Sequence, residues 1–141
     1  MFVVYGEANR LHAMELKEML EKRWSLNVVL LEEEPPEGMT LVEKLEKYGR
    51  QADHAFVIMS PDDCVRNKGE QAYYQPRPNV LFEAGWFCHS LRRKGVTFLV
   101  QEGTDLHSDI SGINYIPFRK RTREVFLEIE GELRKAGVIP G

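Results

Sequence analysis

Short runs of consecutive apolar residues alternate along the chain with longer segments in which apolar residues recur every three or four positions. The apolar runs predict buried strands, and the spacing of three to four predicts amphipathic helices. The strands are expected at Phe2–Tyr5, Val28–Leu31, Ala55–Met59, Val96–Val100 and Tyr115–Phe118. The helices are expected at residues 9–23, 40–49, 79–94 and 122–136.

This alternation predicts an α/β fold of the flavodoxin-like kind, with a five-stranded, mainly parallel sheet flanked by helices on both faces. Thr40 and Glu43 match a capping box at the start of the second helix, and Asn9 is placed to cap the first. Between Ser60 and Pro78 the chain is polar and predicts a loop that is long for a compact domain.

The composition narrows the class of protein. A length of 141 residues fits one domain spanning 1–141, and 43% hydrophobic with 29% charged residues is ordinary globular usage. A net charge of −3 disfavours a general nucleic-acid binder. Apolar runs are far shorter than the roughly 20 residues that cross a membrane. Because the start of the chain also lacks a secretory signal, we expect a cytoplasmic protein, with Cys64 and Cys88 as reduced thiols.

Ligands of open parallel sheets bind beyond the carboxyl ends of the strands. We therefore expect the segments that follow the predicted strands to converge on one site. They are Tyr5–Glu7, Glu32–Gly38, Ser60–Asp63 and the start of the helix at Asn79.

One carboxylate interrupts an almost wholly apolar helix. Residues 78–88 contain Glu83 as their single charged side chain, and Asn79, four residues earlier, shares its helix face. A buried carboxylate needs a reason. The residues alone leave two reasons open. Glu83 interacts with the helix dipole or with an arginine, or it belongs to a functional site.

Other candidates have weaker signals. The Tyr5–Gly6 turn either lets backbone approach a phosphate or ribose or is simply a turn. Asp62 and Asp63 can bind a ligand or Mg²⁺, although an Asx turn is favoured.

No metal site is predicted, because the histidines are not spaced as metal ligands are. They are His12, His54, His89 and His107. The basic run at 119–123 predicts a solvated helix start, whereas Tyr73 and Tyr74 either cover the pocket or contact a partner.

Five motifs in register cover nearly the whole chain: FVVYG (2–6), PEGMT (36–40), SPDD (60–63), PNVLFEAG (78–85), and DISG (109–112) with YIP (115–117). Together they resemble the bacterial TIR-like (Toll/interleukin receptor-like) domains. This branch of the family is associated with antiphage defence effectors. In these, the domain is often fused to a sensor of cyclic nucleotide messengers, such as a STING-like or SAVED module.

The resemblance implies an NAD+ glycohydrolase that uses NAD+ as substrate and needs no separate cofactor. The family's catalytic glutamate, in an Asn-x-x-x-Glu motif, falls on Glu83 and its upstream partner on Asn79. The expected NAD+-contacting residues are Tyr5, Gly6, Gly38, Asp62 and Asn79.

The resemblance also implies a way of regulation. The Glu32–Gly38 loop corresponds to the family's BB loop, which reaches a neighbouring subunit in assembled relatives. The alternative from composition is a solvated acidic loop. Tyr5 stands where relatives often have histidine, and Ala84 where a larger aliphatic residue is common, so substrate contacts are expected to differ.

One carboxylate suffices for this chemistry. Nicotinamide leaves a cationic pyridinium as a neutral molecule, so no general acid must protonate it. Ordinary glycosidases need a pair of carboxylates. The sequence offers no second acidic residue that interrupts an apolar helix as Glu83 does. We expect ionised Glu83 to stabilise the oxocarbenium-like transition state or to hold the ribose hydroxyls.

Three alternatives compete with an NAD+-consuming effector that is silent as a monomer and activated by self-assembly. One is a TIR scaffold that signals by oligomerisation without turnover, and another is an enzyme resembling nucleoside deoxyribosyltransferases. A response-regulator receiver shares the topology but requires an acidic pair after the first strand, where Tyr5-Gly6-Glu7 stands. The sequence leaves open whether the product is linear ADP-ribose or a cyclic isomer.

Overall fold

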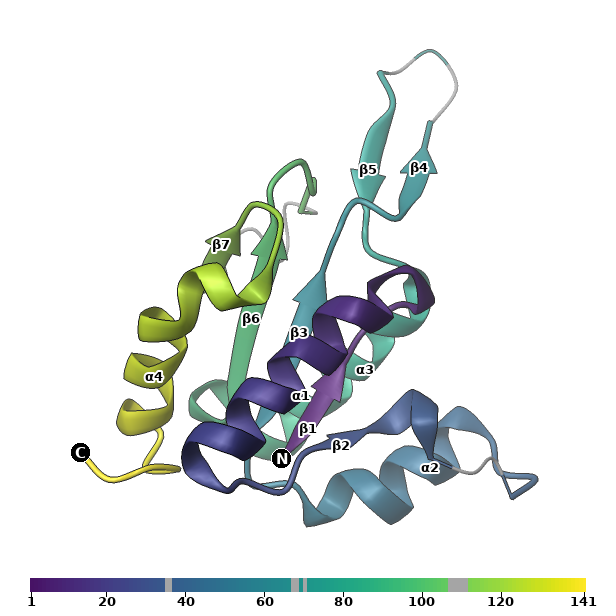
Figure 1. Cartoon of the computed structure of the whole chain (residues 1–141). Coiled ribbons are helices and arrows are strands. Elements are labelled where there is room, and N and C mark those ends of the chain that lie inside the picture. The colour runs from purple at the N-terminus through teal and green to yellow at the C-terminus, as the bar shows by residue number, and fades with distance from the viewer. Residues whose placement is uncertain (35–36, 67–68, 70, 107–111) are drawn as a thin grey trace.

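A parallel sheet forms the centre of the protein. The computed structural model describes residues 1–34, 37–66, 69, 71–106 and 112–141. The sheet strands are β1 (Phe2–Val4), β2 (Val29–Leu30), β3 (Ala55–Met59), β6 (Val96–Gln101) and β7 (Tyr115–Phe118). They are all parallel and lie in the order β2-β1-β3-β6-β7 (Figure 1). This is the flavodoxin-like strand order, so the predicted fold class is confirmed.

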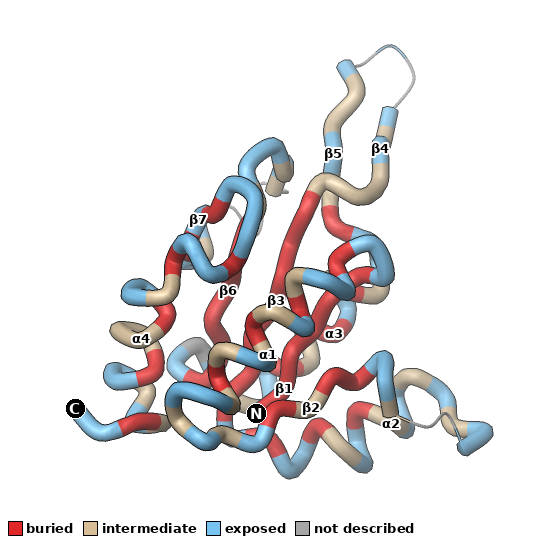
Figure 2. The backbone as a smooth tube through the Cα atoms, in the orientation of Figure 1, coloured by how far each residue is buried: buried red, intermediate tan, exposed pale blue. Residues whose placement is uncertain are grey.

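Helices cover both faces of the sheet. Helices α1 (Arg10–Trp24) and α4 (Phe126–Lys135) pack on one face, and α2 (Leu41–Tyr48) and α3 (Pro78–Leu91) on the other. Because side chains alternate along a strand, neighbouring residues of β1 enter different cores. Val3 lies under α1, whereas Phe2 and Val4 lie under α3. The central strands are therefore buried throughout, as Figure 2 shows.

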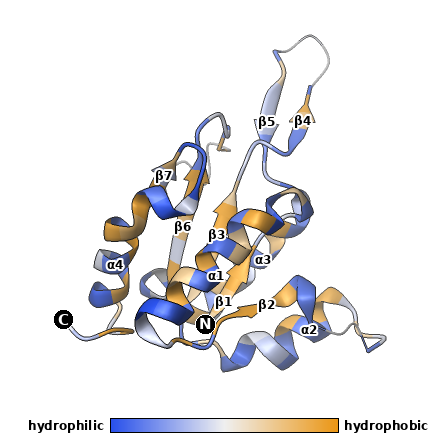
Figure 3. Ribbon diagram, in the orientation of Figure 1, coloured by the Kyte–Doolittle hydropathy of each residue, from blue (hydrophilic) through white to orange (hydrophobic). Residues whose placement is uncertain are grey.

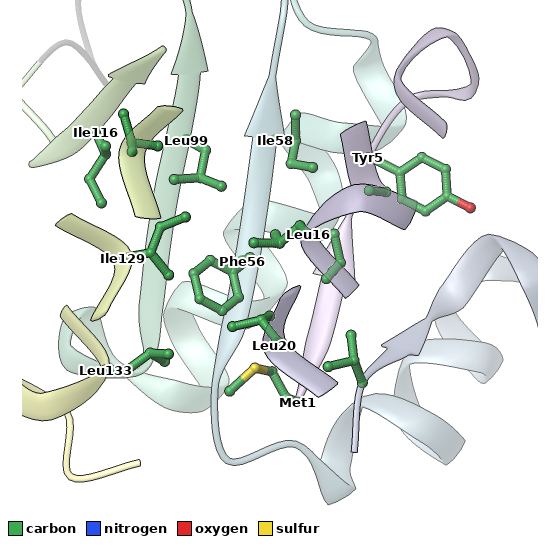
Figure 4. Close-up of a cluster of buried hydrophobic side chains, with 14 of the residues drawn as sticks. Met1, Tyr5, Leu16, Leu20, Phe56, Ile58, Leu99, Ile116, Ile129 and Leu133 are labelled. Atoms are coloured by element: carbon green, nitrogen blue, oxygen red, sulfur yellow. The ribbon is translucent and has the colours of Figure 1, made fainter. Parts of the chain in front are cut away.

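Aromatic residues mark each of the two cores. On the α1 face, Trp24 stacks on Phe126 of α4 with 5.2 Å between ring centroids. Figure 4 shows Tyr5 at one side of this core, with its hydroxyl directed away from the cluster. On the other face, Trp86 of α3 makes an edge-on contact with Phe87 at 5.1 Å. Each face thus carries one tryptophan.

Several predicted boundaries are confirmed, including those of β3 and β7. The capping box is present as well: the Glu43 amide donates to Thr40 Oγ1 and the Thr40 amide donates to Glu43 Oε1, both at 3.2 Å. The last helix differs from the prediction, because its first turn, Thr122–Val125, is a 3-10 turn. Asn9 occupies the N-cap position of α1 but makes no capping hydrogen bond with its side chain.

The prediction of a plain loop between residues 60 and 78 is wrong. This segment contains an antiparallel pair, β4 (Asp63–Val65) and β5 (Tyr73–Gln75), which projects beyond the sheet in Figure 1. Its base is tied to the segment after β6. The Tyr74 amide donates to Asp105 Oδ2 at 2.8 Å, and the Asp105 amide donates to the Tyr74 carbonyl at 2.7 Å. Strands of three residues are too short to show an alternating pattern.

Gly49, after α2, is packed against the rings of α3. A Cβ at this position would lie 2.8 Å from Trp86 Cζ3 and 3.0 Å from its Cη2. We expect Gly49→Ala to destabilise the fold by about 1 to 3 kcal/mol, the usual cost of overpacking. The free energy of unfolding, obtained by chemical denaturation, measures this loss of stability. Gly85→Ala is the matched control, because nothing lies within 4 Å of its added Cβ and alanine favours a helix by about 0.5–1 kcal/mol over glycine. Equal stability of the two variants would contradict the packing argument.

Apolar residues concentrate on the strands, while the helices mix apolar and polar positions (Figure 3). Within the described ranges, no helix combines the length and the hydrophobicity needed to cross a bilayer. Both cysteines are free thiols, Cys64 exposed on the hairpin and Cys88 half-buried on α3.

Candidate functional site at the carboxyl edge of the sheet

Three chain segments meet where β1 and β3 end. A Cβ added to Gly6 would lie 3.2 Å from Asp62 Oδ2 and 3.5 Å from Cδ of Arg77, the residue that precedes α3. The end of β1, the loop after β3 and the start of α3 are therefore in contact. The convergence predicted from strand ends holds for these segments, and Gly6 lacks a side chain where it approaches Asp62 and Arg77.

A polar network fixes the loop after β3. Asn9 is buried, and its side-chain amide donates to Asp62 Oδ2 at 3.2 Å and to the Ser60 hydroxyl. Ser60 in turn donates to Asp62 Oδ1 at 2.8 Å, and the Asp62 amide donates to the Ser60 carbonyl at 2.8 Å. The Asp62 carboxylate thus stabilises a turn, which is the interpretation that the sequence favours. The side-chain amide of Asn9 is held in this network, and Asn9 makes no capping hydrogen bond to α1.

Glu83 is the most unusual charged residue of the edge. It lies in the second turn of α3, its exposed fraction is 0%, and it sits between the buried residues Val80 and Ala84. Neither carboxyl oxygen has a hydrogen-bond partner among the residues that the structure describes. Such a group is costly to keep, so the burial of Glu83 favours a functional role over a purely structural one.

The surroundings of Glu83 disfavour its charged form. Burial raises its pKa from the ordinary 4.5 to about 8, and the negative charge of Glu32 acts in the same direction. The Asn79 amide and the Lys44 ammonium act the other way and lower the pKa by less. At neutral pH the resting carboxyl group is therefore mainly protonated.

Sequence reasoning did not single out two of the residues that act on the Glu83 carboxyl group, Glu32 and Lys44. Glu32 belongs to the 3-10 turn η2 (Leu31–Glu33) directly after β2, and Lys44 lies on α2. Lys44 Nζ donates to the Leu31 carbonyl at 3.4 Å, which joins α2 to the turn. The sequence signal for Glu32 is a run of three glutamates after a predicted strand. Composition alone shows this run as one acidic loop and does not separate its members.

Known proteins match this chain over most of its length. A family profile described as "CAP12/Pycsar effector protein, TIR domain" matches residues 1–120. The chain belongs to this family of TIR domains.

Three curated relatives show how far the likeness extends. The TIR domain is 31% identical over 115 residues to the uncharacterized protein YuaY of Escherichia coli K12, covering 81% of this chain and 38% of YuaY. It is 32% identical over 141 residues to Protein tirC of Dictyostelium discoideum, covering 91% and 68%. It is 36% identical over 80 residues to the Pycsar effector protein PaPycTIR of Pseudomonas aeruginosa, covering 55% and 26%. The chain thus spans well under half of YuaY and PaPycTIR.

The TIR domain does not bring all the predicted NAD+-contacting side chains to Glu83. Tyr5 is buried in the core under α1, on the opposite face of the sheet, and its hydroxyl donates to Glu33 Oε1 at 3.3 Å. Burial, with the nearby Glu33 charge, raises the pKa of Tyr5 to about 12. Asn79 precedes Glu83 on α3, as predicted, and its amide influences the Glu83 carboxyl group. Their roles toward NAD+ stay predictions.

Other predicted positions of the TIR domain lie farther out. Gly38 is exposed and has a φ of +72°, and a Cβ added there would have nothing within 4 Å. Residues 35–36 of the predicted BB loop, His107 and the motif residues 109–111 lie outside the described residues. His54 is buried at the opposite end of β3, with Nε2 2.8 Å from Thr97 Oγ1. Tyr74 is exposed on the hairpin, and its role as a partner contact stays a prediction.

Glu83 is closed to solvent in this conformation of the TIR domain. Two surface hollows are lined by other parts of the molecule, one along α1 with Arg121 and Arg123, the other beside β7 with Asn114 and Glu132. The exposed fraction of Glu83 is 0%. A ligand therefore reaches its carboxyl group only when the segments that cover Glu83 move.

Proposed function

We propose that this TIR domain, residues 1–141 as one domain, is an NAD+ glycohydrolase that acts as an effector in bacterial antiphage defence. The observation that carries the proposal is Glu83, a fully buried carboxyl group without a hydrogen-bond partner in the described part of the chain, at the sheet edge where ligands of this fold class bind. Its family and its relatives named Pycsar effector proteins support the effector role.

The proposed reaction breaks the bond between the ribose C1′ and the nicotinamide nitrogen. The bonding electron pair stays with nicotinamide, which leaves as a neutral molecule. Water adds to C1′ of the resulting oxocarbenium-like centre, and one proton is released. NAD+ and water thus give nicotinamide, ADP-ribose and H+. When the adenine nitrogen replaces water as nucleophile, the product is a cyclic isomer.

Glu83 supplies the negative charge that this reaction needs once its carboxyl group has lost the proton that it holds in the closed domain. The positive charge moves from the pyridinium ring to the ribose during bond cleavage, and an adjacent carboxylate stabilises it most strongly in a site without water. We propose that Asn79 orients the ribose next to Glu83, and that Tyr5, Gly6, Gly38 and Asp62 contribute further contacts to NAD+. For Tyr5, the position on the opposite sheet face favours a contact through its backbone.

The closed site supports activation by self-assembly. In a monomer that shields Glu83 from solvent, turnover is low. We propose that packing of neighbouring TIR domains moves the Glu32–Gly38 loop and opens the site. A fused or associated sensor of cyclic nucleotides would drive this assembly in the cytoplasm, a proposal supported by the similarity to CD-NTase-associated and Pycsar effector proteins.

The test is chromatography of nicotinamide and ADP-ribose after incubation with NAD+, at dilute protein and under conditions that force assembly. We expect release to be low in the dilute sample and to rise steeply on assembly. Deoxynucleosides serve as competing substrates and should remain intact. Absence of nicotinamide in assembled protein would leave a scaffold as the function, and cleavage of deoxynucleosides would indicate a deoxyribosyltransferase-like enzyme.

A further inference from the structure

The hairpin of β4 and β5 has two outer strand edges, and the described part of the domain pairs with only that of β5. We propose that the outer edge of β4 is a contact between two copies of this TIR domain, which pair antiparallel about Cys64. The pairing gives the self-assembly proposed above a defined contact, and to that extent it rests on the proposed function. The contact itself can be tested without turnover.

The hydrogen bonds of Tyr74 show which edge is open. Its amide donates to Asp105 Oδ2 at 2.8 Å, and its carbonyl accepts from the Asp105 amide at 2.7 Å. Both backbone groups of Tyr74 thus point away from β4, so Tyr74 and the opposite residue, Cys64, form a non-hydrogen-bonded pair of the antiparallel ladder. The amide and carbonyl of Cys64 therefore point outward on the other side of the hairpin. Figure 1 shows that β4 lies on this outer side, whereas β5 faces the segment after β6.

The outer edge of β4 is accessible. Beyond the hairpin, the Cys64 amide and carbonyl have no hydrogen-bond partner among the residues that the structure describes. Both Cys64 and Arg66, the next residue whose backbone groups point outward, are exposed. Outward N–H and C=O groups of a strand edge are a template for pairing with another strand. Such pairing also stabilises a two-stranded hairpin, which is marginal by itself.

The charges along this edge favour a second copy as the occupant. The outward-facing positions carry an acid at one end, Asp62, and a base at the other, Arg66. In an antiparallel pair centred on Cys64, each Arg66 lies opposite Asp62 of the second copy, on the same face of the new sheet. The Asp62 carboxylate accepts hydrogen bonds from the neutral groups of Asn9 and Ser60, so its charge remains available for an ion pair.

The same charges fix the register of the pair. A pair centred on Asp62 would place the two Asp62 side chains opposite each other, and a pair centred on Arg66 would do the same with the two arginines. Like charges directly opposite each other are destabilising. The Asp62 amide is also engaged already, because it donates to the Ser60 carbonyl at 2.8 Å. Pairing about Cys64 is the register that matches both the charges and the open backbone groups.

The contact is small and is therefore expected to be weak by itself. Stable complexes bury about 1,600 Å² in total, and β4 has three residues, Asp63–Val65. Dilute copies should stay monomeric for this reason. Copies tethered to a common assembly reach an effective concentration of about 1 mM, at which a weak contact forms. The edge thus responds to local concentration, as the proposed activation requires.

The first test compares Cys64→Pro with Cys64→Ser by sedimentation equilibrium at concentrations up to about 1 mM. Proline removes the outward N–H and leaves the hydrogen bonds within the hairpin, because the Cys64 amide is not part of that ladder. Serine keeps the N–H. We expect the wild type and Cys64→Ser to dimerise, and Cys64→Pro to dimerise about tenfold more weakly or not at all. Equal dimerisation of the two variants, or a monomeric wild type at this concentration, would overturn the contact.

A second variant tests the charges and leaves the backbone of β4 unchanged. Arg66→Glu places an acid opposite Asp62, and we expect dimerisation to weaken by about tenfold or more at low salt. Arg50→Glu is the matched control, because Arg50 is exposed, pairs with Glu46 at 3.6 Å and precedes β3 at the opposite edge of the sheet. The control should dimerise as the wild type does. Equal effects of the two substitutions would overturn the proposed register.

Crosslinking with a short bismaleimide tests the position of the contact directly. Residues opposite each other in a hydrogen-bonded pair have Cα atoms about 5.5 Å apart, so Cys64 should link two copies in a Cys88→Ser protein. The reference protein carries Cys64→Ser, Cys88→Ser and Glu128→Cys, which moves the exposed thiol to α4. Equal linking of the two proteins would overturn the contact.

Nicotinamide release separates this contact from the proposed function. We expect Cys64→Pro to lower release from assembled protein at least as far as it lowers dimerisation. Unchanged release despite lost dimerisation would overturn the role of the contact in activation. A wild-type protein that dimerises through Cys64 and releases no nicotinamide would reject only the proposed function.

Discussion

Replacing Glu83 by glutamine is expected to lower the rate of nicotinamide release by a factor of about 10² to 10³, the usual cost of removing one preorganised electrostatic group. Glutamine keeps the shape of the side chain and removes its charge, so the loss should appear mainly in kcat rather than in KM. The measurement is chromatography of nicotinamide from assembled protein at saturating NAD+. Wild-type turnover in this variant would exclude Glu83 as the catalytic carboxylate.

A matched control separates the role of Glu83 from a general effect of charge removal. Glu128 is an exposed glutamate on α4, on the other sheet face. Glu128→Gln changes the net charge by the same amount, and we expect its rate to stay within about twofold of the wild type, as for most surface changes. A loss shared by both variants would point to impaired assembly.

The same Glu83→Gln substitution is expected to stabilise the fold by a few kcal/mol at pH 8. The unfolded chain ionises Glu83 near pH 4.5, whereas the folded protein does so near pH 8. Between these values the folded state holds the extra proton, so the stabilisation contributed by protonated Glu83 is complete below pH 4.5 and is lost as the pH rises through about 8, by up to about 1.4 kcal/mol per pH unit. Glutamine does not ionise and escapes this loss.

Urea denaturation of both proteins between pH 5 and 8 measures this difference, with Glu128→Gln as the reference for an exposed carboxylate. The gap between wild type and Glu83→Gln should widen with pH and nearly vanish toward pH 4.5. A gap that is constant over this range would mean that Glu83 ionises normally in the folded state. A variant that gains stability as it loses turnover has the signature of a functional residue.

Much of the fold follows from local patterns in the sequence. The run Ala55–Met59 is apolar at every position because β3 is central and buried on both faces. The box formed by Thr40 and Glu43 involves residues three apart, so its hydrogen bonds are readable without tertiary information. The hairpin is different, because β4 and β5 are held by pairing with each other and by Asp105, which lies far along the chain.

The site was predictable only in part, for a similar reason. Glu83 could be found because a carboxylate in an apolar helix contradicts the expected burial pattern. Glu32 could not be separated from Glu33 and Glu34, because the direction of each side chain depends on the 3-10 turn that follows β2. The side of the sheet that Tyr5 faces depends likewise on strand register, which a single residue shifts.

The one tryptophan on each sheet face gives the protein two separate fluorescent reporters. Trp24, stacked on Phe126, senses the packing of α1 on α4, whereas Trp86 lies on the helix that carries Glu83 and touches the Gly49 backbone position at the end of α2. The opening proposed above would change the surroundings of Trp86 and leave those of Trp24 intact. We therefore expect emission from a Trp24→Phe protein to follow this opening in real time, without any label.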